Sequence, residues 1–275
     1  DRETGETIDN CQHVAMGCCT NFRHFCETVG IDTFFRRQHE LFFVGPDGTI
    51  NRFAASRWPA PFHLLSAFRS LSYLSSSDRR SLTRGIRALA KRESAVGDEE
   101  SFADWLARHA QPESVIRQFW HVLLVSALSE SLERIDVSSA RQVVVDGFLS
   151  NRHGWEIDIP SVPLDDLYGE RITDWLTERQ VEIRLQTGVE RLMETDGRIV
   201  AVELRDGEQL SADQVILAVP HHRVTSLLPE SLCAEESIRD VARLESAPIS
   251  SVHLWFDRPI TSLPHAVFVD RLSQW

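Results

Sequence analysis

The densest group of potentially reactive side chains lies near the start of the sequence, in residues 9–26. It contains Cys11, His13, Cys18, Cys19, His24 and Cys26. Structural zinc sites usually contain two close Cys or His pairs of the CxxC kind, and this segment has no such pair. We therefore expect no metal site, and we expect Cys11 and Cys18 to fill small gaps on the buried face of a helix. A catalytic thiol beside His13 is the alternative that these residue types leave open.

Other candidate chemistry in the sequence is sparse. His221 and His222 follow an apolar run, at the carboxyl end of an expected strand, where open α/β sheets place ligands. A solvated loop pair is the alternative interpretation. Asp165 and Asp166 adjoin at an expected helix start, where capping explains them. Lys91 is the only lysine and lies in a polar run, so a P-loop or a Schiff-base lysine has almost no candidate.

The first half of the chain is expected to be helical around one hairpin, since its apolar residues recur mostly at helical spacing. The expected elements are a short strand and helix in 8–29, a hairpin around a Gly-Pro-Asp-Gly turn in 40–53, and helices in 62–93 and 101–134, broken at 75–80 and 91–100. Ser101 is a plausible N-cap for the helix that follows it.

The second half of the chain changes character. An amphipathic helix in 164–180 precedes VEIRL (181–185), which we expect to form a buried strand. Two Asp-Gly turns, at 196–197 and 206–207, then separate the strands of an expected three-stranded meander. VILAV (215–219) is continuously apolar, as in a strand buried on both faces. These elements predict an α/β fold, α+β overall, with an antiparallel insert.

The overall composition limits the classes of protein to which this chain can belong. The chain has 275 residues, 42% of them hydrophobic and 25% charged, with a formal net charge of -12. This length can bury a sizeable core, and the acidic balance argues against a nucleic-acid partner. Its longest strongly apolar run, 119–129, is short for a membrane span of roughly 20 residues. Five cysteines, four of them crowded at one end, favour a reducing cytoplasm.

Several segments, taken in order, carry a family resemblance. They are TGETIDNCQHVAMGCCTNF (4–22), DGFLSNRHGWEIDIPSVPLDDLYGE (146–170), GVERL (188–192), ADQVILAVPHHRVTSLLP (212–229) and HLWFDRPITSLPH (253–265). Together they resemble the flavin-containing amine oxidase and phytoene desaturase superfamily, and within it the hydroxysqualene dehydroxylase branch. The resemblance implies a partial Rossmann-like FAD domain with a β-meander insert, plus a largely helical substrate domain. The implied ranges are 1–35 and 151–235 for the FAD domain, and 36–150 and 236–275 for the substrate domain.

The resemblance also implies site residues. The implied contacts with the flavin or its surroundings are Asn10, Gln12, Val189, Ala218, Val219 and Pro220. Arg152, Trp155 and Pro160 are implied to line the approach to the substrate cavity. We predict His13 as the proton donor, because it is the only histidine in the most specific segment and histidine is a common general acid. For the apolar members of this set, an ordinary core position is the alternative.

The implied reaction is reductive removal of the hydroxyl of hydroxysqualene, with FAD as cofactor and squalene as product, in squalene and hopanoid biosynthesis. The family's GxGxxG turn and its closing flavin motif do not occur in this sequence. We therefore interpret the chain as the middle of a longer protein, and we expect it to bind FAD weakly or not at all and to be inactive alone.

An isoprenoid substrate implies contact with a membrane surface. Residues 58–74 combine aromatic and leucine side chains with one arginine, which suits a membrane-facing element; a buried helix is the alternative. We expect a cytoplasmic protein, peripheral on the inner face of the cell membrane. The alternative functions are a carotenoid desaturase or amine oxidase of the same fold and, from another class, a non-catalytic Cys/His metal-binding or ligand-binding protein.

Overall fold

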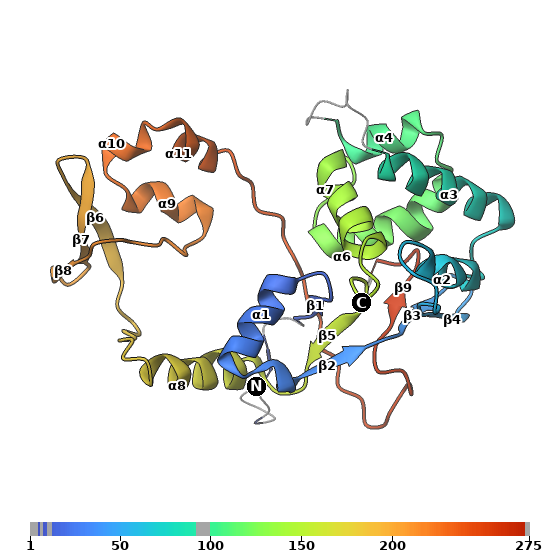
Figure 1. Ribbon diagram of the computed structural model, residues 1–275, viewed down its shortest axis with the longest axis horizontal. Helices are drawn as coiled ribbons and strands as arrows, with labels where there is room; N and C mark the ends of the chain where they lie inside the picture. Colours follow the sequence, from blue (N-terminus) through green and yellow to red (C-terminus); the bar gives the residue numbers. More distant parts are fainter. Residues whose placement is uncertain (1–4, 6–7, 10–12, 92–99, 273–275) are drawn as a thin grey trace. The chain divides into compact units, whose positions relative to one another are not determined.

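The computed structural model describes residues 5, 8–9, 13–91 and 100–272. The chain divides into two compact units. Unit 1 comprises 1–175 and 248–275, and unit 2 comprises 176–247 (Figure 1). Mixed helix and sheet in both units confirm the predicted α/β class. The domain ranges implied by the family resemblance remain predictions.

Two small sheets organise unit 1. The first has the order β1-β5-β2, with both pairs antiparallel, and the second has the order β4-β3-β9, with β9 parallel to β3. Their strands are β1 (Ala15–Met16), β2 (Phe35–Gln38), β3 (Leu41–Val44), β4 (Ile50–Phe53), β5 (Ile157–Pro160) and β9 (Val267–Phe268). β3 and β4 confirm the predicted hairpin. Gly48 has a positive φ of 84° in its turn, a conformation that glycine adopts without strain.

Helices make up most of the rest of unit 1 (Figure 1). They are α1 (Thr20–Val29), η1 (Asp32–Phe34), η2 (Phe62–Leu64), α2 (Leu65–Ser70), α3 (Ser76–Ala90), α4 (Phe102–Arg108), α5 (Glu113–Val115), η3 (Ile116–Trp120), α6 (His121–Leu128), α7 (Val137–Arg141), η4 (Gln142–Leu149), η5 (Asp165–Arg171) and α8 (Ile172–Thr177), which continues into unit 2. Ser101 caps α4 as predicted, since its side chain accepts a hydrogen bond from the Asp104 N–H. The predicted break at 75–80 is shorter than expected, because Ser75 forms a capping box with Asp78 and the helix begins at Ser76.

One large core holds the helices from η2 to η4 to the sheets, and a separate cluster of Cys26, Ile31 and Leu167 holds α1 and η5. Trp105, Trp120 and Trp155 are almost completely buried in the large core. The ring of Trp155, beside β5, lies 5.6 Å from the ring of Phe53 in the hairpin. Large aromatic side chains bury more apolar surface than any others, so this contact ties β5 to the second sheet and the helical layer.

The inward-facing residues of the first helix differ from those predicted. We expected Cys18 on its buried face, yet Cys18 precedes the helix, and Phe25 within it is 42% exposed. The Cys19 N–H donates to the Met16 carbonyl, so a turn delays the helix until Thr20. Cys26 then becomes the buried residue of α1.

Unit 2 contains the predicted meander and three short helices. Its elements are β6 (Val189–Thr195), β7 (Arg198–Leu204), β8 (Gln209–Ser211), α9 (His221–Leu227), α10 (Glu230–Cys233) and α11 (Glu236–Val241). Asp196 and Gly197 have φ values of 51° and 76°, as a two-residue hairpin turn requires. Leu192, Leu204 and Leu227 are buried in this unit.

Two predicted strands of unit 2 are wrong. Residues 181–185 and 215–219 belong to no strand, and Leu185 and Ile216 are 82% and 92% exposed. A buried strand requires neighbours on both edges and cover on both faces. Within the part of the chain that the structure describes, neither segment has a strand partner.

Candidate active site

Charged side chains gather on one face of the β1-β5-β2 sheet. Successive side chains point to alternate faces of the sheet along the segment that leads into β5, and those of Trp155 and Ile157 enter the helical core. Glu156 and Asp158 therefore point to the opposite face. Each carboxylate meets a basic residue from β2 or its end, namely Arg37 or His39. The sheet thus separates an apolar core from a charged surface.

Arg37 is the central cation of this face. Its Nε donates to Asp158 Oδ1 over 2.8 Å and its Nη2 donates to Asp158 Oδ2 over 2.5 Å, a bidentate pair between partly buried groups. Its Nη1 lies 3.7 Å from Glu156 Oε2. Such paired hydrogen bonds set the orientation of both side chains.

Glu156 joins two histidines. His39 Nδ1 and His153 Nδ1 lie 3.0 and 2.9 Å from the same Glu156 oxygen, Oε1. The glutamate is 5% exposed, whereas both imidazoles face solvent. Burial raises the pKa of Glu156, but the hydrogen bonds from His153 and His39 outweigh it, and the pKa is lowered from its ordinary value. An ionised carboxylate only accepts hydrogen bonds, so each Nδ1 carries a proton. We call His39, Glu156 and His153 the histidine–glutamate cluster.

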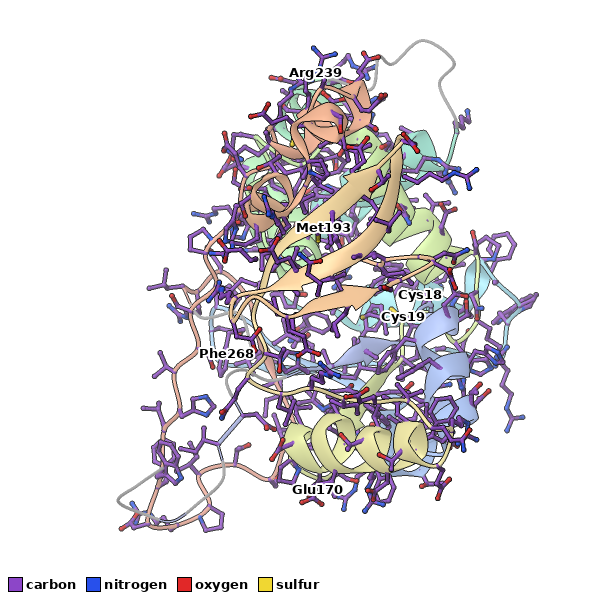
Figure 2. All side chains as sticks on the ribbon, turned by 90° about the vertical axis from the view of Figure 1, so that its left-hand side faces the viewer. Cys18, Cys19, Glu170, Met193, Arg239 and Phe268 are labelled. Atoms are coloured by element: carbon purple, nitrogen blue, oxygen red, sulfur yellow. The ribbon has the colours of Figure 1, made fainter. Side chains whose placement is uncertain are left out.

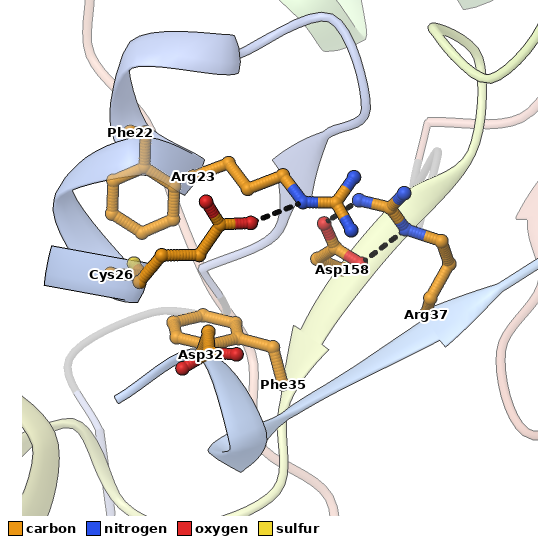
Figure 3. A pocket seen from close by; sticks show the side chains of 8 residues that line it. Phe22, Arg23, Cys26, Asp32, Phe35, Arg37 and Asp158 are labelled. Carbon is orange, nitrogen blue, oxygen red and sulfur yellow. Dashed lines mark hydrogen bonds and ion pairs between the residues drawn. The ribbon is translucent and has the colours of Figure 1, made fainter. Parts of the chain in front are cut away.

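A small cavity of about 140 Å³ lies between α1 and this charged face (Figure 3). It is lined by Phe22, Arg23, Cys26, Glu27, Asp32, Phe35, Arg37 and Asp158. Drug-sized ligands occupy roughly 300–1,000 Å³, so this cavity does not hold a flavin or a long lipid. Burial, followed by the charges of Asp32 and Asp158, raises the pKa of the Cys26 thiol. Cys26 is therefore a poor nucleophile at neutral pH.

Cys11, the predicted thiol beside His13, lies outside the described residues, whereas Cys18 and Cys19 precede α1 (Figure 2). Their side chains are hydrogen-bonded to each other, and burial together with Cys19 raises the pKa of Cys18. A raised pKa leaves little thiolate at neutral pH. Among the described residues, no group of three or more His, Cys, Asp or Glu side chains is arranged to hold a metal ion.

The predicted residues of unit 1 have different surroundings. His13 is exposed and precedes β1, whereas Asn10 and Gln12 lie outside the described residues. Trp155 is 1% exposed, and its indole N–H donates to the Arg152 carbonyl over 3.1 Å. Pro160 pairs with Phe35 at the edge of β5 and β2. Trp155 thus has a core position, and the substrate contacts implied for these residues remain predictions.

Arg152 holds a loop in place. Its guanidinium donates three hydrogen bonds of 2.9–3.1 Å, to the carbonyl oxygens of Ser56, Arg57 and Trp58. Trp58 is 68% exposed at the end of this loop. Arg152 therefore positions an exposed aromatic side chain, a role that its sequence context did not predict.

The predicted cofactor residues of unit 2 are mostly exposed. Val189 begins β6 opposite Leu204. Ala218, Val219 and Pro220 were expected to end a buried strand, but all three are exposed. Pro220 instead precedes α9, whose first residues are the predicted pair His221 and His222.

Sequence reasoning missed the histidine–glutamate cluster. The spacing His-x-x-Glu at 153–156 was a local signal for one contact. His39 lies 117 residues from Glu156, and only the pairing of β2 with β5 brings it there.

Comparison with known proteins decides the family. Residues 1–274 match the flavin-containing amine oxidoreductases. The chain belongs to this family. Membership confirms the predicted superfamily, the oxidoreductase class and the cofactor, FAD. The hydroxysqualene branch is not distinguished by this match.

Similar curated proteins include the 15-cis-phytoene desaturase of Synechococcus elongatus, 23% identical over 97% of this chain and 59% of the relative. The chloroplastic/chromoplastic 15-cis-phytoene desaturase of Solanum lycopersicum is also 23% identical, over 97% of this chain and 47% of its own length. A probable zeta-carotene desaturase of Synechococcus elongatus is 23% identical over 95% and 60%. The chain spans about half the length of the curated relatives that it matches.

Solved structures agree on the fold. An oxidoreductase from Methanosarcina mazei superposes with a TM-score of 0.57 at 16% identity, covering 85% of this chain and 51% of that one. A putative protoporphyrinogen oxidase from Exiguobacterium sp. 255-15 gives 0.50 at 19% identity, covering 84% and 52%. At these identities the likeness shows the fold and no activity.

Proposed function

We propose that this chain forms part of an FAD-dependent oxidoreductase that removes the hydroxyl group of hydroxysqualene reductively, giving squalene for hopanoid or related lipids. The observation that carries the proposal is the pairing of β1 with β5. Ala15 lies opposite Asp158 and Met16 opposite Ile157, so the most specific resembling segment, 4–22, meets another resembling segment, 146–170, in one sheet. The names of relatives add an isoprenoid substrate class, since phytoene and carotene are isoprenoids.

A carotenoid desaturase is the second candidate, and the named relatives favour it. Dehydroxylation runs with reduced flavin and desaturation with oxidised flavin, so the two reactions need opposite cofactor states. The test is product analysis of a longer, flavin-loaded protein that contains this chain, with hydroxysqualene under reducing conditions and phytoene under oxidising conditions. Squalene formation supports the proposal, and desaturated phytoene without squalene would overturn it.

FAD would contact the exposed, largely apolar segment that precedes α9. Residues 213–220 pair with no described strand, and Ile216 and Val219 are 92% and 37% exposed, so this backbone is free to meet a cofactor. Val189, Ala218, Val219 and Pro220 are the residues that would hold it. When bound, FAD supplies the hydride for the reaction.

We also propose a peripheral membrane position, on the inner face of the cell membrane. Three apolar side chains of the predicted segment 58–74 are substantially exposed, Trp58, Phe62 and Leu65 at 68%, 54% and 46%. Leu64 is fully buried, so the segment also serves the core. No helix among the described residues is long and apolar enough to cross a membrane.

Liposome flotation tests this membrane position. Phe62→Asp and Leu65→Asp should reduce the liposome-bound fraction with little change in the unfolding midpoint, because about half of each side chain is already exposed to solvent. Leu244→Asp, at a 58% exposed apolar site outside this segment, is the matched control. Equal binding by all variants would remove the proposal.

A further inference from the structure

We infer that an exposed face formed by Arg57, Trp58, Phe62, Leu65 and Arg69 binds the anionic phospholipid headgroups of a bilayer. We call it the 57–69 face. The inference rests on the proposed membrane position and deepens it, because it names the lipid charge that recruits the protein and the two arginines that recognise that charge.

The helical period separates the 57–69 face from the core. Along η2 and α2, Phe62, Leu65 and Arg69 are exposed at intervals of three and four residues. Leu64 and Ala67, which lie between them in the sequence, are buried. A helix that lies on a bilayer presents its exposed apolar side chains in this way, so the face can meet lipid while the core stays packed.

Hydrogen bonds hold the loop before η2 in one conformation. The Arg152 guanidinium donates to the carbonyl oxygens of Ser56, Arg57 and Trp58. The Ser56 N–H donates to the His63 carbonyl over 2.7 Å, which closes the loop. These bonds use the backbone of Arg57 and Trp58, and both side chains are exposed. A surface that is ordered before binding loses less conformational entropy when it binds.

The 57–69 face is cationic although the protein is acidic. Residues 48–77 contain no Asp or Glu, whereas the chain as a whole contains 41. Within this stretch, Arg52 is paired with Glu40 from the preceding segment. Arg57 and Arg69 form no ion pair with any residue that the structure describes. Their charges are therefore available to an anionic partner.

Neighbouring charges leave the two arginines uncompensated. On the adjoining sheet face, Arg37 is neutralised by Asp158, and Arg152 offsets the charge of Glu156. His63 adds no charge, because burial, followed by the charge of Arg152, lowers its pKa and keeps the imidazole neutral. The 57–69 face thus keeps the positive charges of both of its arginines.

Charge and apolar exposure together identify an anionic bilayer as the partner. The formal net charge of -12 repels such a surface, but screening limits this repulsion to about 8 Å at physiological salt. The bilayer therefore attracts the protein only when the 57–69 face is turned toward it. Each arginine near an anionic surface strengthens binding roughly fivefold, and tryptophan favours the boundary between lipid and water.

Vesicle binding of a longer protein that contains this chain tests the inference. The vesicles are phosphatidylcholine alone and an equal mixture of phosphatidylcholine and phosphatidylglycerol. We expect binding to the mixture to be at least tenfold tighter, and Arg57→Gln and Arg69→Gln each to weaken it about fivefold without changing binding to phosphatidylcholine. Arg87→Gln, at an exposed arginine of α3 outside the face, is the matched control and should bind as wild type does.

Salt and folding controls accompany this comparison. Raising the salt to about 1 M, where the screening length is about 3 Å, should remove the preference for phosphatidylglycerol. The urea midpoint should stay unchanged in Arg57→Gln and Arg69→Gln, because both side chains are exposed.

The outcomes separate this inference from the proposal beneath it. Equal binding to both kinds of vesicle, or equal losses in Arg57→Gln, Arg69→Gln and Arg87→Gln, overturns the inference and leaves the membrane position standing. No binding to either kind of vesicle overturns both and identifies the face as a protein-binding surface instead. The proposed oxidoreductase activity is tested separately, by product analysis.

Discussion

Gly17→Ala should destabilise unit 1, because the glycine lies where two backbone segments touch. A Cβ atom at position 17 would lie 2.0 Å from the carbonyl oxygen of His153, with no flexible side chain to move aside. Real Cβ contacts below 3.0 Å essentially never occur, so the segments must separate by about 3.0 − 2.0 = 1.0 Å. Gly17 therefore fixes the distance between β1 and the segment that carries the histidine–glutamate cluster.

The expected magnitude follows from this shift. The Gly17 N to Glu156 O hydrogen bond, now 2.7 Å, would lengthen beyond hydrogen-bonding distance. Its loss costs about 1 kcal/mol, and overpacking adds roughly 1–3 kcal/mol. Alanine also lowers the conformational entropy of the unfolded chain relative to glycine, which returns about 0.4–1 kcal/mol of stability. We expect the free energy of unfolding to fall by about 2 kcal/mol.

Urea unfolding followed by tryptophan fluorescence measures this change. All seven tryptophans lie in unit 1, so the signal reports that unit alone. Gly147→Ala is the matched control, because its Cβ would meet the Cys18 sulfur at an ordinary 3.5 Å, and it should stay within about 0.5 kcal/mol of wild type. A loss below about 0.5 kcal/mol in Gly17→Ala would refute the close approach of these segments.

Three further predictions concern unit 1. Ser75→Ala removes the capping box of α3 and should lower the free energy of unfolding by about 1 kcal/mol, measured by urea titration; no change would mean that the cap is dispensable. Gln111→Ala leaves the buried Trp120 indole N–H, now 3.1 Å from the glutamine oxygen, without an acceptor, and should cost about 2–4 kcal/mol in the same titration; a loss below about 0.5 kcal/mol would contradict this. The pKa of Glu156 in the folded protein lies below its ordinary value of 4.5, so the ionised carboxylate stabilises the fold fully above that value and loses this effect as pH falls through the folded pKa. In Glu156→Gln, the free energy of unfolding should therefore fall less steeply as the pH is lowered below 4.5. An unchanged slope would contradict this.

Local sequence signals predicted the elements whose partners are close in the chain. The hairpin of β3 and β4 and the meander of β6 to β8 join neighbours through short glycine-containing turns, so pattern and turn chemistry sufficed. Ser101 was also predictable, because a helix cap depends on residues within one turn. The family and its cofactor followed from the order of several segments along the chain.

The same patterns failed where pairing is not local. VEIRL and VILAV have strand-like composition, but a strand forms only when a partner meets its backbone groups, and composition does not supply the partner. The phase of α1 failed for a related reason, since a turn before Thr20 shifted which residues face inward.

Residue identity and spacing thus determined the local elements, the acidic character and the family of this protein. The tertiary structure alone decided the candidate active site, because His39 reaches Glu156 only through the pairing of β2 with β5, and Gly17 reaches the same residue only through the turn after β1. Hydrogen bonds of about 3 Å between residues more than 100 positions apart depend on the whole packed unit, which no local pattern records.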